Sequence, residues 1–239
     1  MRLDKYLADA TGMTRTESAR AIRGGAVTVD GSVAKKPETH IDEKSAAVTL
    51  RGTPVGWQAF HYVMLHKPAG TVSTTDPDKR SVMHLIPPEL SRHGMFPCGR
   101  LDVDTEGLLL ITDDGALAHE LLSPRHHAEK VYFFRCEPPL TAEMAETLER
   151  GVLLDGEMTK PAAVSREADG CSGTITLTEG KFHQIKRMLH AVGSEITYLR
   201  RERFGTLVLD ENLAPGECRA LTDGEISALR ALAAAQTRE

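Results

Sequence analysis

The stretch GRLDVDTEGLLLIT, residues 99–112, joins a short polar loop to a strand. The apolar run at its end predicts a strand that is buried on both faces. A carboxylate in the loop, such as Asp102, would be held rigidly beside this strand and shielded from water. Arg100 could keep that carboxylate ionised, and an ionised, fixed carboxylate can act as a nucleophile or base. The alternative is a solvated turn in which the side chains of Asp102, Asp104 and Glu106 all face water.

Other apolar runs predict further strands, and apolar residues at helical spacing predict helices. The predicted strands are residues 62–65, 107–112, 131–136, 174–178 and 196–199. The predicted helices are residues 116–123, 142–150, 183–192 and 223–234. Because the strands are not separated by one helix each, a doubly wound parallel sheet is disfavoured. The pattern predicts an α+β domain over residues 61–234 with a mixed, largely antiparallel sheet.

Residues 1–52 predict a separate small module of two helices and a small sheet. The first helix would end at a glycine and carry Asp4 on its outer face. Thr14 and Glu17 form a capping box for the second helix. The strands expected in the sheet are residues 27–29, 32–34 and 48–50. Residues 53–60 are expected to link this module to the larger domain, because glycine and proline punctuate the start of that stretch.

The distribution of charge is more informative than its total. The 239 residues are 41% apolar and 26% charged, which is ordinary for a globular protein, and the net charge of −5 argues against a protein that simply coats nucleic acid. Residues 1–36 hold seven Lys or Arg against four Asp or Glu, and residues 181–204 hold six against two, whereas residues 137–179 hold three against nine. Two basic segments on an acidic body suit a protein that touches nucleic acid with one face. Ordinary scatter of surface charge is the alternative.

Several classes of protein are disfavoured by what the sequence lacks. No apolar run approaches the roughly 20 residues of a membrane helix, and the N-terminus has no apolar signal core, so we expect a cytoplasmic protein with no membrane partner. The four cysteines include no CxxC pair. His126 and His127 are adjacent and lack HxH or HExxH spacing, so we expect no metal site.

A second candidate segment is EGKFHQIKRM, residues 179–188, which predicts a turn followed by a basic helix. Its apolar stripe leaves Lys186 and Arg187 on or beside the exposed face. These two could contact phosphate and supply a cation for a buried acid, although an ordinary amphipathic helix would look the same. Tyr132 begins another strand, where an aromatic residue usually belongs to the core. If Tyr132 is instead a functional residue, its ring would lie beside a base or a sugar.

Four motifs occur together in chain order: Lys67-Pro68, GRLDxxTxGLLL at 99–110, Lys130-x-Tyr132 and HQIKRM at 183–188. This set resembles the RsuA-type pseudouridine synthases, and residues 1–50 resemble an S4 RNA-binding domain. SPRHH at 123–127 and LAPGE at 213–217 look most like the small-subunit branch of that family. The resemblance covers nearly the whole chain and implies a mixed sheet with an active cleft across its middle.

The resemblance implies an enzyme that isomerises uridine to pseudouridine in small-subunit (16S) rRNA, at position 516. Asp102 stands at the position of the catalytic aspartate, Tyr132 at that of a tyrosine that stacks on the target base, and Lys186 at that of a basic residue that pairs with the aspartate. Arg100 matches an arginine near the RNA, and Leu199 an apolar residue that lines the pocket. The further residues expected to bind RNA are Lys67, Arg187, Lys5, Arg15, Arg20, Arg23, Lys35 and Lys36.

The implied reaction involves no redox change and no net hydrolysis, so we expect no cofactor. The carboxylate could add to C1′, assist elimination at C2′ to a glycal, or add to C6 of the ring, and the sequence leaves these routes open. We expect a monomer that needs no protein partner. Two other interpretations also stay open. One is a pseudouridine synthase that acts on large-subunit (23S) rRNA, and the other is a non-enzymatic S4-type RNA-binding or ribosome-assembly protein.

Overall fold

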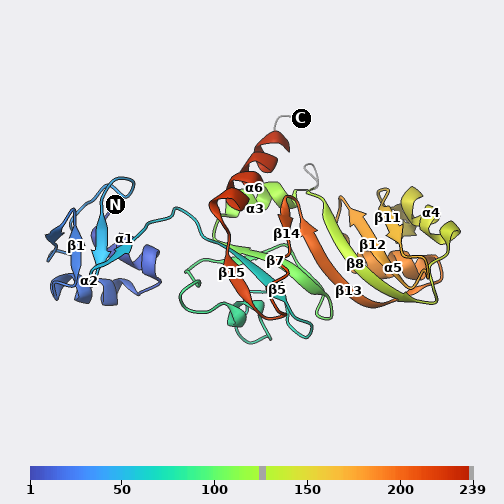
Figure 1. Cartoon of the computed structure of the whole chain (residues 1–239), viewed down its shortest axis with the longest axis horizontal. Helices are drawn as coiled ribbons and strands as arrows, with labels where there is room; N and C mark the ends of the chain where they lie inside the picture. The colour runs from blue at the N-terminus through green and yellow to red at the C-terminus, as the bar shows by residue number, and fades with distance from the viewer. Residues whose placement is uncertain (124–127, 237–239) are drawn as a thin grey trace. The chain divides into compact units, whose positions relative to one another are not determined.

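The computed structural model describes residues 1–123 and 128–236. The chain divides into two compact units (Figure 1): residues 1–61 with 87–95 form unit 1, and the remainder forms unit 2. None of the helices in the described parts of the chain combines the length and the hydrophobicity needed to cross a membrane.

Unit 1 packs two helices, α1 (Leu3–Thr11) and α2 (Arg15–Arg23), against a four-stranded sheet. The predicted capping signals are present, because Gly12 follows α1 with a left-handed φ of 77° and Thr14 forms a capping box with Glu17. In spatial order the strands are β2 (Ser32–Val33), β1 (Val27–Val29), β3 (Val48–Leu50) and β4 (Thr53–Val55). The buried core residues are Leu3, Tyr6, Leu7, Ile22, Val27 and Val48.

The stretch expected to begin the linker instead completes this sheet. Residues 53–55 form β4, which pairs antiparallel with β3. The chain reverses through Arg51 and Gly52, whose φ angles are both positive, at 52° and 83°. A two-residue turn of that kind matches the twist of a hairpin, so the glycine that suggested a linker belongs to a turn between two strands.

Asp4 was expected to point outward, and this expectation is wrong. Its side chain is nearly buried and accepts hydrogen bonds from Arg2 Nη2 at 2.7 Å and Arg15 Nη2 at 2.8 Å. The Arg2 hydrogen bond, together with that of Arg15, outweighs the effect of burial and lowers the pKa of Asp4 to about 2. Arg15 therefore links α2 to the start of α1. This structural role is additional to the RNA binding expected from the sequence.

Unit 2 is built on a nine-stranded mixed sheet. The main path runs β11 (Ala163–Arg166), β12 (Ser172–Leu177), β8 (Lys130–Glu137), β13 (Glu195–Phe204), β7 (Glu106–Thr112), β5 (Tyr62–Lys67) and β15 (Cys218–Ala220). Off this path, β14 (Leu207–Val208) pairs with β13, and β6 (Phe96–Cys98) pairs with β7. Among the strand pairs described in this sheet, β13 and β7 alone run parallel. The predicted α+β fold with a largely antiparallel sheet is confirmed.

In the described part of unit 2, four α-helices accompany this sheet (Figure 1). They are α3 (Gly115–Leu122), α4 (Ala142–Arg150), α5 (Gln184–Ala191) and α6 (Asp223–Gln236). Helices α3 and α6 contact each other and share a core with β5 and β7, whereas α4 lies against β11 and α5 against β13. The unit also contains a short 3-10 helix, η1 (Val82–Leu85), and the hairpin of β9 (Leu153–Leu154) and β10 (Glu157–Met158). The four predicted helices are confirmed to within one or two residues.

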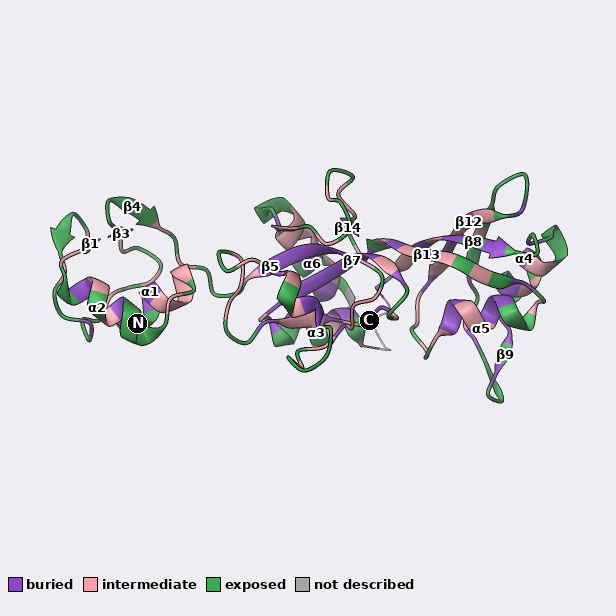
Figure 2. Cartoon of the chain, turned by 90° about the horizontal axis from the view of Figure 1, so that it is seen from below, coloured by how far each residue is buried: buried purple, intermediate pink, exposed green. Residues whose placement is uncertain are grey.

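Strand β7 positions the loop that precedes it. Residues 107–112 are all buried, as predicted, and Figure 2 colours β7 as buried along most of its length. Gly107 lies opposite Arg201 of the parallel strand β13 and has a φ of 108°. A Cβ at this glycine would lie 2.3 Å from the Arg201 carbonyl oxygen, so a side chain does not fit there. This close approach fixes the end of the 99–105 loop beside β13.

Candidate active site

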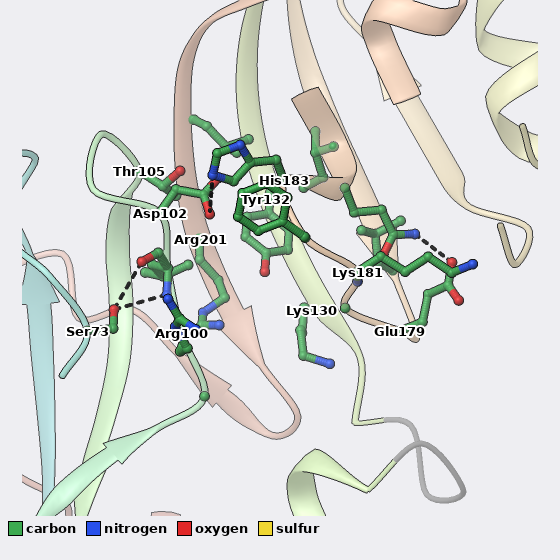
Figure 3. Close-up of a pocket in the computed structure, with 18 of the residues that line it drawn as sticks. Ser73, Arg100, Asp102, Thr105, Lys130, Tyr132, Glu179, Lys181, His183 and Arg201 are labelled. Atoms are coloured by element: carbon green, nitrogen blue, oxygen red, sulfur yellow. Dashed lines mark hydrogen bonds and ion pairs between the residues drawn. The ribbon is translucent and has the colours of Figure 1, made fainter. Parts of the chain in front are cut away.

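A cavity of about 580 Å³ opens on unit 2, where the 99–105 loop, the start of α5, β8 and β13 meet (Figure 3). A concave site of this size is typical of those that bind small ligands or single nucleotides. Five of the residues predicted from the sequence line it: Arg100, Asp102, Tyr132, Lys186 and Leu199. The structure therefore gathers candidates that lie on four separate segments of the chain.

Asp102 faces a lysine and a histidine at the start of α5. Its Oδ2 lies 3.3 Å from Lys186 Nζ, and its Oδ1 lies 3.7 Å from His183 Nε2. Figure 3 shows the His183 ring directed at the carboxylate, whose side chain is 28% exposed. Arg100, expected to keep Asp102 ionised, is exposed and makes no ion pair with it in the described structure. The positive charge beside the carboxylate comes from Lys186 instead.

Lys186 holds a second carboxylate as well. Its Nζ donates to Asp104 Oδ1 at 2.5 Å, and the Asp104 side chain is mostly exposed. Burial lowers the pKa of Lys186, but its hydrogen bond to Asp104 and the charge of Asp102 outweigh burial and leave that pKa above its usual value. Burial raises the pKa of Asp104, and the contact with Lys186 more than reverses this effect. Lys186 thus remains a fixed cation at neutral pH.

The loop that carries Asp102 is fastened by Lys67, the last residue of β5. Lys67 Nζ donates to the carbonyl oxygens of Thr105 at 2.8 Å, Pro68 at 3.1 Å and Val103 at 3.2 Å. The side chain is fully buried, so the expectation that Lys67 binds RNA is wrong. From sequence alone, a lysine at the end of a strand is expected to be exposed. Here the ammonium group is buried, and three loop carbonyls accept its hydrogen bonds.

Ser73 holds the start of the same loop. Its Oγ donates to the carbonyl oxygen of Leu101 and accepts from the Leu101 amide, both at 3.1 Å, and Figure 3 draws these bonds. Within the loop, the Thr105 amide donates to the carbonyl oxygen of Asp102 at 3.1 Å. The backbone on both sides of Asp102 is therefore restrained, which favours a fixed position for its carboxylate.

Replacing Lys67 by Met is expected to loosen this loop. Burial, partly opposed by Asp104, lowers the pKa of Lys67 to about 8, and its ammonium group still donates three hydrogen bonds to loop carbonyls that Met cannot make. We expect the free energy of unfolding to fall by about 2–4 kcal/mol and turnover to fall with it, while RNA affinity changes little. Denaturant unfolding and filter binding measure these effects.

The exposed Lys79, which pairs with Asp76, provides the matched control Lys79→Met. This variant removes one positive charge from the same unit without touching the loop. Wild-type stability of Lys67→Met together with weakened RNA binding would restore the original expectation of an RNA contact.

The floor of the pocket comes from β8 and β13. Tyr132 lies opposite Arg201 in the register of these strands, and Leu199 precedes Arg201 by two residues, so the three side chains share one face of the sheet. Tyr132 and Leu199 are both nearly buried. The aromatic ring, expected beside a base or sugar, therefore stands at the bottom of the cavity that contains Asp102.

Arg201 and Lys130 are pocket residues that were not predicted as site residues. Arg201 is nearly buried, and its Nε donates to the Leu108 carbonyl oxygen at 2.8 Å, whereas its Nη2 has no hydrogen-bond partner among the described residues. An unpaired buried N–H group is rare in folded proteins, so this one calls for a partner. The sequence feature that could have identified Arg201 is its two-residue spacing from Leu199, which places both side chains on one face of a strand. Lys130 also lines the pocket, and burial, assisted by the charge of Arg201, lowers its pKa to about 8.

Other predicted residues lie outside the pocket. Arg187 pairs through Nη2 with Asp155 at 2.6 Å and is absent from the lining. The paired histidines at 126 and 127 fall outside the described residues, and the described part of the chain contains no group of three or more His, Cys, Asp or Glu residues suited to a metal ion. The predicted cations of unit 1 are all exposed: Lys5, Arg15, Arg20, Arg23, Lys35 and Lys36.

Comparison with known proteins gives two family matches. Residues 61–191 match the RNA pseudouridylate synthase family, and residues 1–45 match the S4 domain. The first match includes the Asp102 loop, Tyr132 and Lys186. The two matches fall on the two parts of the chain that the sequence predicts to be separate domains.

Similar proteins extend the match to nearly the full length. An uncharacterised RNA pseudouridine synthase of Bacillus subtilis is 44% identical over 96% of this chain and 98% of its own. Ribosomal small subunit pseudouridine synthase A of Escherichia coli (strain K12) is 42% identical over 96% of this chain and 100% of its own. A crystal structure of a pseudouridylate synthase, 37% identical, superposes with a TM-score of 0.67 over 96% of this chain and 99% of that one. The chain therefore belongs to the RNA pseudouridylate synthase family, and is an isomerase with an N-terminal S4 RNA-binding domain.

Proposed function

We propose that this enzyme converts a uridine of small-subunit (16S) rRNA, at position 516, into pseudouridine, with Asp102 as the catalytic carboxylate. The observation that carries the proposal is the pairing of Asp102 with Lys186 in a pocket floored by Tyr132. The choice of RNA is supported by the S4 domain and by relatives named ribosomal small subunit pseudouridine synthase A, which match over their whole length.

The reaction explains why these residue types are needed. The bond between N1 and C1′ breaks and a bond between C5 and C1′ forms, while C5 loses a proton and N1 gains one. Asp102 would add to C1′, assist elimination at C2′ to a glycal, or add to C6. Each route needs an ionised carboxylate, and Lys186 supplies the neighbouring positive charge. Because oxidation state and water are unchanged overall, we expect no cofactor.

The floor of the pocket would hold the target base. A uridine must leave its stack to reach Asp102, at a cost of a few kcal/mol, and stacking on Tyr132 would return about 1–3 kcal/mol. The unpaired Nη2 of Arg201 would donate to a uracil carbonyl oxygen. We assign to the Tyr132 hydroxyl the transfer of the proton that leaves C5.

The exposed cations of unit 1 would bind phosphates of the surrounding RNA. Contacts of this kind position the RNA without reading its sequence. We infer a cytoplasmic location from the rRNA substrate. We also infer a monomer, because every group that the chemistry calls for comes from one chain.

Reversing two of these charges tests the role of unit 1. The double variant Arg20→Glu, Arg23→Glu is expected to weaken RNA binding about tenfold or more and to flatten its dependence on salt. At saturating RNA its turnover should match wild type, because Asp102 and its partners are unchanged. Filter binding at several salt concentrations measures the first effect.

The double variant Arg150→Glu, Arg166→Glu is the matched control. It makes the same change in net charge at exposed positions in the acidic segment of unit 2. Equal affinity of the two double variants at moderate salt would remove unit 1 from the RNA-binding surface.

Mapping of the product tests the choice of substrate. Purified enzyme is incubated with 16S rRNA, 23S rRNA and partly assembled small subunits, and pseudouridine is located by chemical labelling and reverse transcription. We expect one new pseudouridine, at position 516 of the 16S rRNA. Modification of 23S rRNA alone would keep the chemistry and refute the substrate.

A further inference from the structure

Phe182 is the most exposed large apolar side chain among the described residues, with 74% of its surface accessible. It lies between β12 and α5 and lines the same pocket as Asp102 and Tyr132. Isolated exposed apolar residues are common on protein surfaces and have no meaning by themselves. The position of this ring at a catalytic pocket makes its immediate contacts informative.

One face of the Phe182 ring is already occupied. It stacks on the His183 imidazole with ring centroids 3.8 Å apart and an interplanar angle of 17°. The imidazole in turn lies 3.7 Å from Asp102, measured from Nε2 to Oδ1. Because the inner face of the phenyl ring is covered and most of the side chain is still accessible, the outer face is the exposed one. The imidazole of His183 therefore lies between Asp102 and the phenyl ring of Phe182.

The loop that presents this ring is held by several hydrogen bonds. Gln184, which is nearly buried, accepts from the Lys181 amide at 2.8 Å and donates to Glu179 Oε1 at 2.6 Å. Arg187 Nη1 donates to the Phe182 carbonyl oxygen at 3.3 Å. His183 has a left-handed φ of 48°, which is unfavourable for a residue with a side chain. The loop thus keeps a restrained conformation in which an apolar ring faces water.

We propose that the outer face of Phe182 stacks on the nucleobase adjacent to the target uridine. This inference rests on the proposed binding of that uridine beside Asp102. When a uridine leaves its stack, the neighbouring base loses a partner on one face. A flat aromatic ring can replace that partner, whatever the base, because every base has a π-face. The ligand of this subsite is therefore an unstacked base in a loop or single-stranded segment of RNA.

Coupling between protein and RNA changes tests this subsite. The probes are a short RNA hairpin that the wild-type enzyme modifies and two versions of it with an abasic residue on the 5′ or the 3′ side of the target. We expect Phe182→Ala and Phe182→Leu to bind the intact hairpin about tenfold more weakly, and Phe182→Tyr to bind like wild type. One abasic hairpin should weaken wild-type binding by a similar factor and cause no further loss for Phe182→Ala.

Val208→Ala is the matched control, because Val208 is an exposed apolar residue of unit 2 that does not line the pocket. It should bind all three hairpins like wild type. Wild-type affinity of Phe182→Leu would show that the ring contributes only apolar bulk, and multiplicative losses for Phe182→Ala on both abasic hairpins would show that it contacts neither neighbour. Either result overturns the proposal. Because the readout is binding, it is independent of turnover. Failure of the proposed function would instead appear in the reaction itself, as conversion of uridine to pseudouridine by Asp102→Asn.

Discussion

Replacing Asp102 by Asn is expected to reduce the single-turnover rate by about a thousandfold or more while leaving RNA affinity within a few-fold of wild type. The amide has nearly the same shape but cannot serve as a nucleophile or base, and groups in these roles commonly contribute factors of 10²–10⁴ or more. The side chain is partly exposed, so its loss should not unfold the protein. Conversion is measured by chromatography of nucleosides from digested RNA.

Asp104→Asn is the matched control for this variant. Asp104 also touches Lys186 but is mostly exposed and does not line the pocket. It should keep most of the activity, because Lys186 would still pair with Asp102. A rate for Asp104→Asn as low as that for Asp102→Asn would mean that the sequence and structure identify the wrong carboxylate.

Replacing Lys186 by Met is the second change with a large expected effect, a loss of about a hundredfold in the single-turnover rate. Removing one preorganised electrostatic contact from an active site typically costs factors of 10²–10³. Lys186 is the cation that approaches both Asp102 and Asp104, and its raised pKa keeps it charged at neutral pH. Without it, the pKa of Asp104 should rise, because Lys186 holds that pKa down.

The pH dependence and two further variants make this prediction specific. Since the pKa of Lys186 is raised, its contribution to the ion pairs is present at neutral pH and is lost as pH rises through that raised pKa, whereas the contribution of Asp104, whose pKa is lowered, is lost only as pH falls into the acid range. Lys186→Arg should keep more activity than Lys186→Met at every neutral pH. Lys79→Met removes a cation of the same unit that pairs with Asp76 and does not line the pocket, and it should act like wild type. Equal rates for Lys186→Met and Lys186→Arg would refute an electrostatic role.

Local sequence patterns were sufficient for much of the fold. The buried strand at 107–112, the capping box at Thr14 and the four predicted helices of unit 2 depend on contacts within a few residues. Strand β13 extends to Phe204. The prediction ended at residue 199 because the arginines that follow interrupt the apolar pattern of a strand. Strand β4 was missed because a turn glycine and a proline also fit a linker.

The candidate site depends on contacts that sequence spacing does not encode. Asp102 and Lys186 lie on distant segments, and only the resemblance to a known family suggested their pairing, which the structure forms at 3.3 Å. Lys67 and Arg201 are charged side chains in a buried environment, where the usual expectation of exposure fails because backbone carbonyls accept their hydrogen bonds. Such partners appear only once the chain is folded.

The most direct test uses small-subunit rRNA labelled with tritium at C5 of uridine, because forming the new carbon–carbon bond expels that hydrogen. Tritium released to water is counted for the wild-type enzyme and for Asp102→Asn, with 23S rRNA in parallel. We expect about one equivalent of tritium per small-subunit rRNA from wild type and none from the variant. Undiminished release by Asp102→Asn, or no release from small-subunit rRNA by the wild-type enzyme, would contradict the account.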